Sequence, residues 1–192
     1  MKYKIGIYGS AEGADANVGE KAIALGETLS KYTKEFIVLT GAGNGIPPMI
    51  AQVFSKSGGE VWGFSACTNI DEQKKQTPEV DISIYSKFVF IPKDFPFQSD
   101  VNVSKKYRNV TSTATSDGGI IISGRWGTMN EFTNLFDMGK PIGVLMGTGG
   151  ISDELPSLLQ KISKKSKSKV IFNNSSEELV KGLLEELKTR FA

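Results

Sequence analysis

The stretch from Asp117 to Glu131, DGGIIISGRWGTMNE, constrains the fold of this chain more than any other segment. Three consecutive isoleucines, Ile120 to Ile122, are typical of a strand that is covered on both faces. A glycine-rich turn follows, and apolar residues at helical spacing come next. We predict a buried strand, a tight turn and a helix whose first N–H groups can bind a phosphate. The alternative is an ordinary connection in which the glycines serve only the turn.

The rest of the chain repeats this alternation of strands and helices. Strand-like apolar runs also occupy residues 4–9, 36–40, 60–65, 87–92, 140–146 and 170–172. Helical patterns separate most of these runs, as in the β-α-β units of a parallel sheet. The 192 residues contain no linker or internal repeat, so residues 1–192 are expected to form a single domain. We predict a three-layer α/β fold, doubly wound around a mostly parallel sheet of about seven strands with its first strand in the interior.

Three of the predicted strands end in polar or glycine turns. The turn residues are Gly9, Ser10, Gly41, Gly43, Asn44, Gly45, Gly124, Arg125, Trp126, Gly127 and Thr128. In a doubly wound sheet, ligands bind outside the carboxyl ends of the strands. We therefore predict that these residues form one phosphate- or nucleotide-binding site. Neither GxGxxG after the first strand nor GxxxxGK[ST] is present, which argues against a standard NAD site and a P-loop hydrolase.

Composition excludes several kinds of chemistry. The chain has no histidine, which rules out Ser-His-Asp triads and most zinc sites, and Cys67 is its only cysteine. The formal net charge is +2, with acids and bases interspersed, and no apolar stretch is long enough to span a bilayer. We expect a cytoplasmic protein with no metal, no resident cofactor, and no membrane or nucleic-acid partner. Its expected ligand is a small nucleotide or another phosphorylated molecule.

The sequence leaves open the roles of three segments between residues 66 and 115. Residues 66–86 show no clear periodicity and are predicted to form a long loop, with at most a short helix. The aromatics Phe95 and Phe97 follow a strand, where they could cover a ligand or fill a subunit interface. On the next helix Val103, Tyr107, Val110 and Ala114 form an apolar stripe. Arg108 lies beside that stripe, as a surface arginine would.

The stretch RNVTSTATSDGGIIISGRWGTMNE resembles the signature of the LOG (Lonely Guy) phosphoribohydrolases, also called the "possible lysine decarboxylase" family. That pattern is an arginine, an aspartate nine residues later, a buried strand and PGGxGTxxE. Tyr8 to Ser10 and Thr40 to Gly45 resemble the first two ligand loops of the family. The resemblance covers roughly residues 3–146 and implies a Rossmann-like fold. The same superfamily includes DprA-type DNA-processing proteins and molybdenum-cofactor carriers.

The resemblance implies an activity and two catalytic residues. Members cleave the N-glycosidic bond of a nucleoside 5′-monophosphate and release a free base and ribose 5-phosphate. Glu131 would be the carboxylate that stabilises the oxocarbenium-like transition state, and Arg108 would position the substrate. The amides of Gly124 to Thr128 would hold the phosphate. Family members are commonly dimers or larger, so a homo-oligomer is expected.

The sequence departs from the family pattern at four positions. Ser123 replaces the family proline, and Arg125 stands where a second glycine is expected. Arg125 could add a cation for phosphate, or its bulk could reshape the pocket. Asn130 occupies a position that is acidic in many active enzymes, and Asn109 one that usually holds lysine. The alternative to hydrolysis is therefore a protein that binds or carries a nucleotide or phosphorylated cofactor without turnover.

Overall fold

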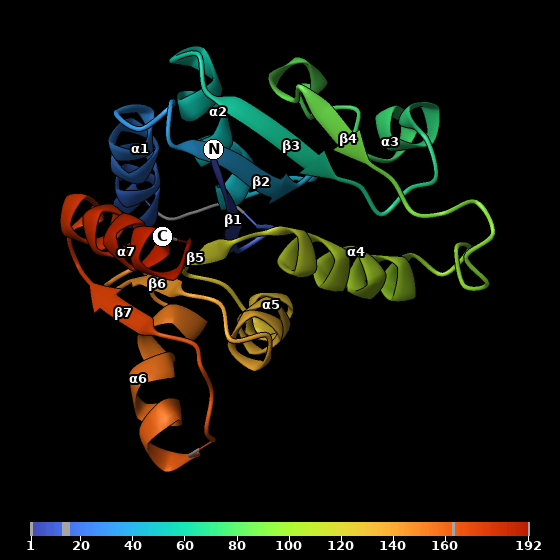
Figure 1. Cartoon of the computed structure of the whole chain (residues 1–192). Coiled ribbons are helices and arrows are strands. Elements are labelled where there is room, and N and C mark those ends of the chain that lie inside the picture. Colours follow the sequence, from blue (N-terminus) through green and yellow to red (C-terminus); the bar gives the residue numbers. More distant parts are fainter. Residues whose placement is uncertain (1, 13–15, 163, 192) are drawn as a thin grey trace.

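A parallel sheet forms the centre of the computed structural model, which describes residues 2–12, 16–162 and 164–191 (Figure 1). Seven strands in this part of the chain have the order β4-β3-β2-β1-β5-β6-β7, and all neighbouring pairs are parallel. The strands are β1 (Tyr3–Gly9), β2 (Phe36–Gly41), β3 (Glu60–Phe64), β4 (Lys87–Val89), β5 (Gly118–Ile122), β6 (Ile142–Leu145) and β7 (Val170–Asn173). The predicted sheet, with its first strand in the interior, is confirmed.

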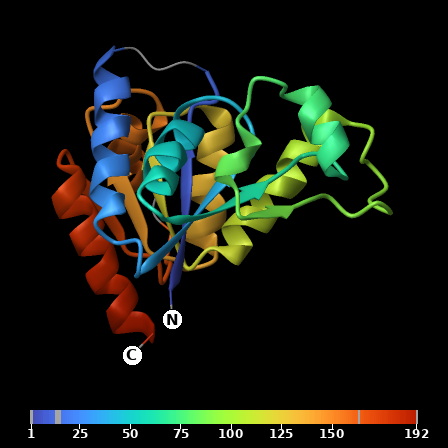
Figure 2. The ribbon, with the colours of Figure 1, turned by 90° about the horizontal axis from the view of Figure 1, so that it is seen from above.

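Helices cover both faces of the sheet, which gives the three layers that the sequence predicts (Figures 1 and 2). They are α1 (Ala16–Ser30), α2 (Ile46–Lys56), α3 (Ile70–Gln76), α4 (Val101–Thr115), α5 (Trp126–Asp137), α6 (Ile151–Lys161) and α7 (Ser176–Phe191), with a 3-10 turn η1 (Ile82–Ile84). One apolar core lies between the sheet and α1, α2 and α7, and a smaller one lies beneath α5 and α6. The described part of the chain contains no helix with the length and apolarity needed to cross a bilayer.

The central strands explain why the chain folds around the stretch identified first. Ile120, Ile121 and Ile122 of β5 are fully buried, because core residues pack against both faces of this strand. β1 pairs with β2 on one side and with β5 on the other. The chain therefore reverses its strand order at β1, and the carboxyl ends of β1, β2 and β5 lie next to one another. This is where a doubly wound sheet binds its ligand.

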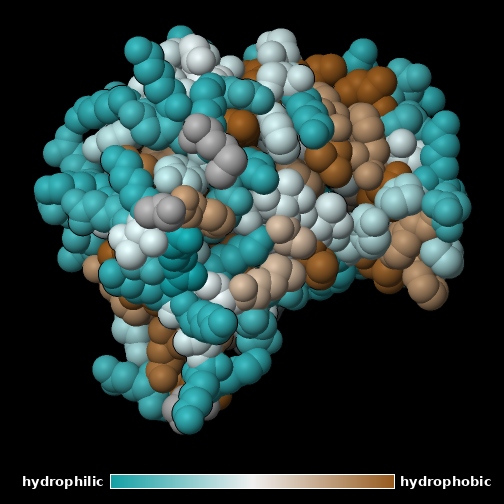
Figure 3. All heavy atoms as spheres, in the orientation of Figure 1, coloured by the Kyte–Doolittle hydropathy of each residue, from teal (hydrophilic) through white to brown (hydrophobic). Residues whose placement is uncertain are grey.

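The apolar stripe predicted on α4 does not face the core. Val103 and Val110 are exposed, whereas the buried residues of this helix are Ser104, Asn109, Ser112 and Thr113. Burial is tolerated because the hydroxyls of Ser112 and Thr113 donate to the backbone carbonyl of Asn109 within their own helix. Figure 3 views the molecular surface in the orientation of Figure 1. Hydrophobic side chains gather on the side of the molecule where α4 lies, and mostly hydrophilic ones cover the side of α1 and α7.

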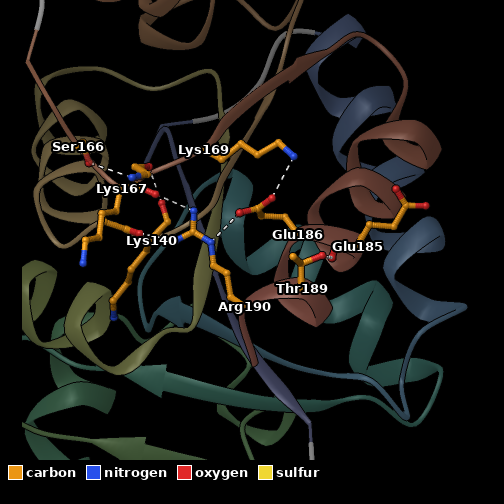
Figure 4. Close-up of polar contacts among 10 residues, drawn as sticks. Lys140, Ser166, Lys167, Lys169, Glu185, Glu186, Thr189 and Arg190 are labelled. Atoms are coloured by element: carbon orange, nitrogen blue, oxygen red, sulfur yellow. Dashed lines mark hydrogen bonds and ion pairs between the residues drawn. The ribbon is translucent and has the colours of Figure 1, made fainter. Parts of the chain in front are cut away.

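Arg190, near the end of α7, fastens the basic segment that precedes β7. Its guanidinium donates to the carbonyls of Gly139 and Lys167 and to the carboxylate of Glu186, which also pairs with Lys169 (Figure 4). A single side chain thus joins α7 to two loops. The basic segment from Lys161 to Lys169 is therefore held to α7 through the carbonyl of Lys167 and the side chain of Lys169.

Replacing Arg190 by alanine is expected to lower the free energy of unfolding by about 1–2 kcal/mol, because two carbonyls lose a charged donor. Urea denaturation would measure the change. Lys188→Ala is the matched control, since Lys188 is an exposed residue two positions before Arg190 in α7. If the two variants are equally stable, the contacts of Arg190 contribute nothing measurable.

Candidate functional site

A cavity of about 790 Å³ opens at the carboxyl ends of β1, β2 and β5. Three walls enclose it: the loop after β1, the loop after β2 together with α3, and the facing ends of α4 and α5. Ten predicted site residues line it, namely Gly9, Ser10, Gly41, Gly43, Asn44, Arg108, Arg125, Gly127, Thr128 and Glu131. The fold thus brings the three turns together, although the first and the third are more than 110 residues apart in the chain.

Three predicted residues, Gly45, Gly124 and Trp126, do not line the cavity. The Trp126 side chain is 81% exposed and points to solvent. Gly45 packs against the loop after β1, where the N–H of Ile46 donates to the carbonyl of Ser10 at 2.9 Å. Gly124 lies behind the first turn of α5. These positions shape the walls rather than the cavity surface.

The turn between β5 and α5 depends on two consecutive residues with positive φ. Ser123 has φ 52° and Gly124 has φ 95°. Proline, which the family pattern places where Ser123 stands, has φ fixed near −65° and could not adopt this conformation. The turn is held from behind by α6, because the N–H of Ser123 donates to the Thr148 hydroxyl and that of Ile151 donates to the Gly124 carbonyl. The start of α5, with its positive dipole end, faces the cavity.

Arg108 is a half-buried residue of the cavity wall, not a surface arginine. Its guanidinium lies against the backbone of Gly41, where a Cβ atom would be only 2.9 Å from Nη1. Nη2 donates to the side-chain oxygen of Asn109 at 2.9 Å, and the Asn109 amide donates to Asn130 at 3.3 Å. Two departures from the family pattern therefore touch each other. A neutral amide pair, Asn109–Asn130, stands where the pattern has a lysine and an acid.

Among the carboxyl groups of the described residues, that of Glu131 has the most strongly shifted pKa. Its side chain opens on the cavity but is largely withdrawn from water, with 9% of the residue exposed. Burial raises the pKa of Glu131 to about 7, and the positive charges of Arg108 and Lys106 oppose that rise. Burial and the nearby Glu131 also raise the pKa of the Tyr8 phenol well above its usual range. A carboxyl that titrates near neutrality inside a cavity is typical of a functional group.

Arg125 lies at the mouth of the cavity and forms a 2.7 Å ion pair with Glu12 from the loop after β1. Both side chains are mostly exposed, so this pair contributes little to stability. Within the described residues, no group of three or more His, Cys, Asp or Glu side chains is placed to hold a metal ion. The described lining of the cavity includes one carboxyl, several cations and backbone amides.

The sequence prediction missed one wall of the cavity. Residues 66–86, predicted to be a long loop that could include a short helix, do contain the short helix α3 and the 3-10 turn η1, but the prediction did not place them at the cavity. The buried Gln73 of α3 donates to the Ala42 carbonyl, which fastens this helix to the loop after β2. The sequence signal that could have located α3 is Asn69, whose side chain accepts the N–H groups of Asp71 and Glu72 as an N-cap. Phe95 and Phe97 contact each other and do not line the cavity.

α4 supplies further residues that the prediction also missed. Asn102, Lys105, Lys106 and Asn109 line the cavity in addition to Arg108. These four positions have the spacing i, i+3, i+4 and i+7, which places them on one face of the helix. This polar spacing is visible in the sequence, but lysines on a helix are usually solvated, so the spacing alone does not indicate a cavity wall.

A sequence model of the SLOG cluster4 family matches residues 2–180. The chain belongs to this family. The predicted resemblance to LOG-like proteins is thereby confirmed at the level of the superfamily. Among curated proteins, none matches the sequence significantly.

Several solved structures share the fold of this SLOG cluster4 protein. TM1055 has a TM-score of 0.72 at 21% identity, over 97% of this chain and 99% of its own. The molybdenum cofactor binding protein from the phototrophic bacterium Rippkaea orientalis has a TM-score of 0.69 at 19% identity, over 100% and 99%. DNA processing protein A from Helicobacter pylori has a TM-score of 0.66 at 18% identity, over 96% and 81%. Identities this low establish the fold alone.

The expectation that nucleic acid is excluded as a partner is wrong. The Helicobacter pylori structure concerns the single-stranded DNA binding mode of that protein, so this fold is compatible with a nucleic-acid ligand. The prediction failed because it rested on a net charge of only +2. Net charge does not reveal local clustering, and the SLOG cluster4 protein gathers Lys105, Lys106, Arg108 and Arg125 around one cavity.

Proposed function

We propose that this SLOG cluster4 protein is a nucleoside 5′-monophosphate phosphoribohydrolase. The observation that carries the proposal is Glu131, a buried carboxyl with a pKa near 7 that opens on a cavity rich in cations and helix-end amides. A nucleotide needs a phosphate site, and bond cleavage at its ribose needs a carboxylate next to the anomeric carbon. The cavity contains residues suited to both tasks.

Each wall of the cavity has a role in this proposal. The first amides of α5 around Gly127, with the Thr128 hydroxyl, bind the 5′-phosphate. Arg108 neutralises substrate charge and, because it lies against Gly41, fixes the position of the ribose phosphate. The ionised form of Glu131 stabilises positive charge as the bond to the base breaks, and it directs water to the ribose. The products are the free base and ribose 5-phosphate.

The second candidate function is that of a non-catalytic carrier. The Asn109–Asn130 amide pair favours it, because it replaces groups that carry charge in the family pattern. The likeness to a molybdenum cofactor binding protein is compatible with it as well. A carrier needs tight binding and no turnover, so the two functions differ in a single measurable product, the free base.

Incubation with AMP, GMP, CMP or UMP separates the two functions. The phosphoribohydrolase proposal expects free base and ribose 5-phosphate in equal amounts, measured by liquid chromatography. Arg108→Ala should weaken substrate binding and lower kcat/KM by about a hundredfold, because its charge acts on the ground state and the transition state alike. If none of these nucleotides releases its base while the protein binds one of them tightly and intact, the phosphoribohydrolase proposal fails and the carrier function is supported.

A further inference from the structure

One face of α4 forms a basic wall of the cavity, beyond the carboxyl that the proposed reaction uses. Asn102, Lys105, Lys106 and Asn109 share this face and line the cavity. The side chain of Asp100 caps the helix by accepting the N–H groups of Asn102 and Val103. In Figure 1 the N-terminal half of α4 extends past the arrowheads of β2 and β3, and Figure 2 agrees. The basic wall therefore continues outward from the sheet edge.

The lysines of this wall have no ion-pair partner among the described residues. In the described parts of the chain, no acidic side chain forms an ion pair with Lys105, Lys106 or Arg108. Of the described residues that line the cavity, only Glu131 is acidic. Three cations and a single, largely buried carboxyl thus line the same cavity. Lys105 and Lys106 are exposed at the cavity wall, so their charges are available to an anionic ligand.

A single phosphate satisfies only part of this wall. The 5′-phosphate of the proposed substrate belongs at the start of α5, near Gly127 and Thr128. The rise of an α-helix places Asn102 about 10 Å along the axis from Asn109. That length exceeds the reach of one phosphate, and the cavity of about 790 Å³ lies towards the upper end of ligand-site volumes. Lys105 and Lys106 lie on a different helix from the α5 amides that would hold the first phosphate, and they form no ion pair within the described residues.

We propose that Asn102, Lys105 and Lys106 form a second phosphate subsite, so that the ligand is a nucleoside 5′-diphosphate or a conjugate built on one. This inference rests on the proposed function, because it assumes that the same cavity holds the first phosphate. The second phosphate extends outward from the first along α4. The two lysines act as flexible point charges on its oxygens, and the Asn102 amide adds a hydrogen-bond donor.

The lining of the cavity favours a small polyanion over a single nucleic-acid strand. Binding of single strands relies on exposed aromatic rings on which successive bases stack. Tyr8 is the aromatic residue among the described residues of the lining, and it is buried in the core beneath the cavity. Trp126 is exposed but lies outside the cavity. The basic wall offers charge without a stacking surface, which suits a diphosphate.

Titration calorimetry with the matched pairs AMP and ADP, and GMP and GDP, tests the subsite. We expect one diphosphate to bind wild type at least about tenfold more tightly than its monophosphate. The double variant Lys105→Gln/Lys106→Gln should lose this advantage while its affinity for the monophosphate changes less than about twofold. Lys181→Gln/Lys188→Gln on α7 is the matched control, because it removes two exposed lysines away from the cavity.

The outcomes separate the subsite from the proposed reaction. Equal affinity of wild type for both members of each pair, equal loss of both in the lysine variant, or no binding of any nucleotide would overturn the subsite. Tighter binding of single-stranded oligothymidylate, lost in the same variant, would assign the wall to nucleic acid instead. If the protein prefers the diphosphate, loses this preference in the lysine variant and releases no base, the subsite proposal is supported and the phosphoribohydrolase proposal fails. Release of base from monophosphates without that preference would do the reverse.

Discussion

Replacing Glu131 by glutamine should lower the rate of base release by about two orders of magnitude or more. Glutamine keeps the size and polarity of the side chain but cannot stabilise the positive charge that develops on the ribose. Binding of the nucleotide should change only a few-fold, because the carboxylate contributes mainly in the transition state. Single-turnover measurement of base release, paired with calorimetry, separates the two effects. A variant that still releases base at the wild-type rate would show that Glu131 is not the catalytic carboxylate.

The same residue predicts a pH dependence. Burial raises the pKa of Glu131 to about 7, so its carboxylate form increases as the pH rises through neutrality. If the carboxylate is the active form, kcat/KM should rise up to about pH 7 and level off above it. Glu131→Gln should remove this dependence, and Glu154→Gln, an exposed acid of α6, should keep it. A rate that falls as the pH rises would instead make Glu131 a general acid that protonates the departing base.

Replacing Gly45 by alanine should lower the free energy of unfolding by about 3 kcal/mol or more. Gly45 has φ 101° and ψ −156°, a conformation almost confined to glycine. An added Cβ would also lie 2.2 Å from the backbone oxygen of Ser10, and that oxygen cannot move without breaking the contact between two loops. Chemical denaturation would measure the loss of stability.

Gly43→Ala is the control for this substitution. Gly43 lies in the same loop, but a Cβ atom there would meet no atom within 4 Å and its φ is not positive. Its expected effect on stability is below about 1 kcal/mol. If Gly43→Ala and Gly45→Ala were equally stable, the loop after β2 would not be held by the carbonyl of Ser10.

The fold was predictable because local and long-range signals agree. Buried isoleucines, glycine turns and helical periodicity each indicate a doubly wound sheet, and the sheet itself brings the turns after β1, β2 and β5 together. The error on α4 has a physical origin. Predicting a buried face from an apolar stripe assumes that the polar face stays in water. On α4 the polar face is buried instead, because the hydroxyls of Ser112 and Thr113 donate hydrogen bonds within their own helix.

The site was predictable only in part. The family pattern located Glu131 and Arg108, and both line the cavity. It did not reveal that Asn109 and Asn130 contact each other, because 21 residues separate them and only the packing of α4 against α5 brings them together. Periodicity also could not reveal that the lysines of α4 face a cavity. That depends on how far this helix extends beyond the sheet, which is set by tertiary packing.

The position of β1 also constrains how the polypeptide matures during synthesis. Of the seven strands in the described sheet, β1 is made first, yet one of its partners, β5, begins at Gly118. Until that segment emerges, the nascent chain has an unpaired edge on an interior strand, and such edges favour aggregation. Ser10 and Glu131 can then meet across the cavity only after more than half of the chain has been made. Nascent chains that stop before Gly118 should therefore depend on chaperones and bind no nucleotide.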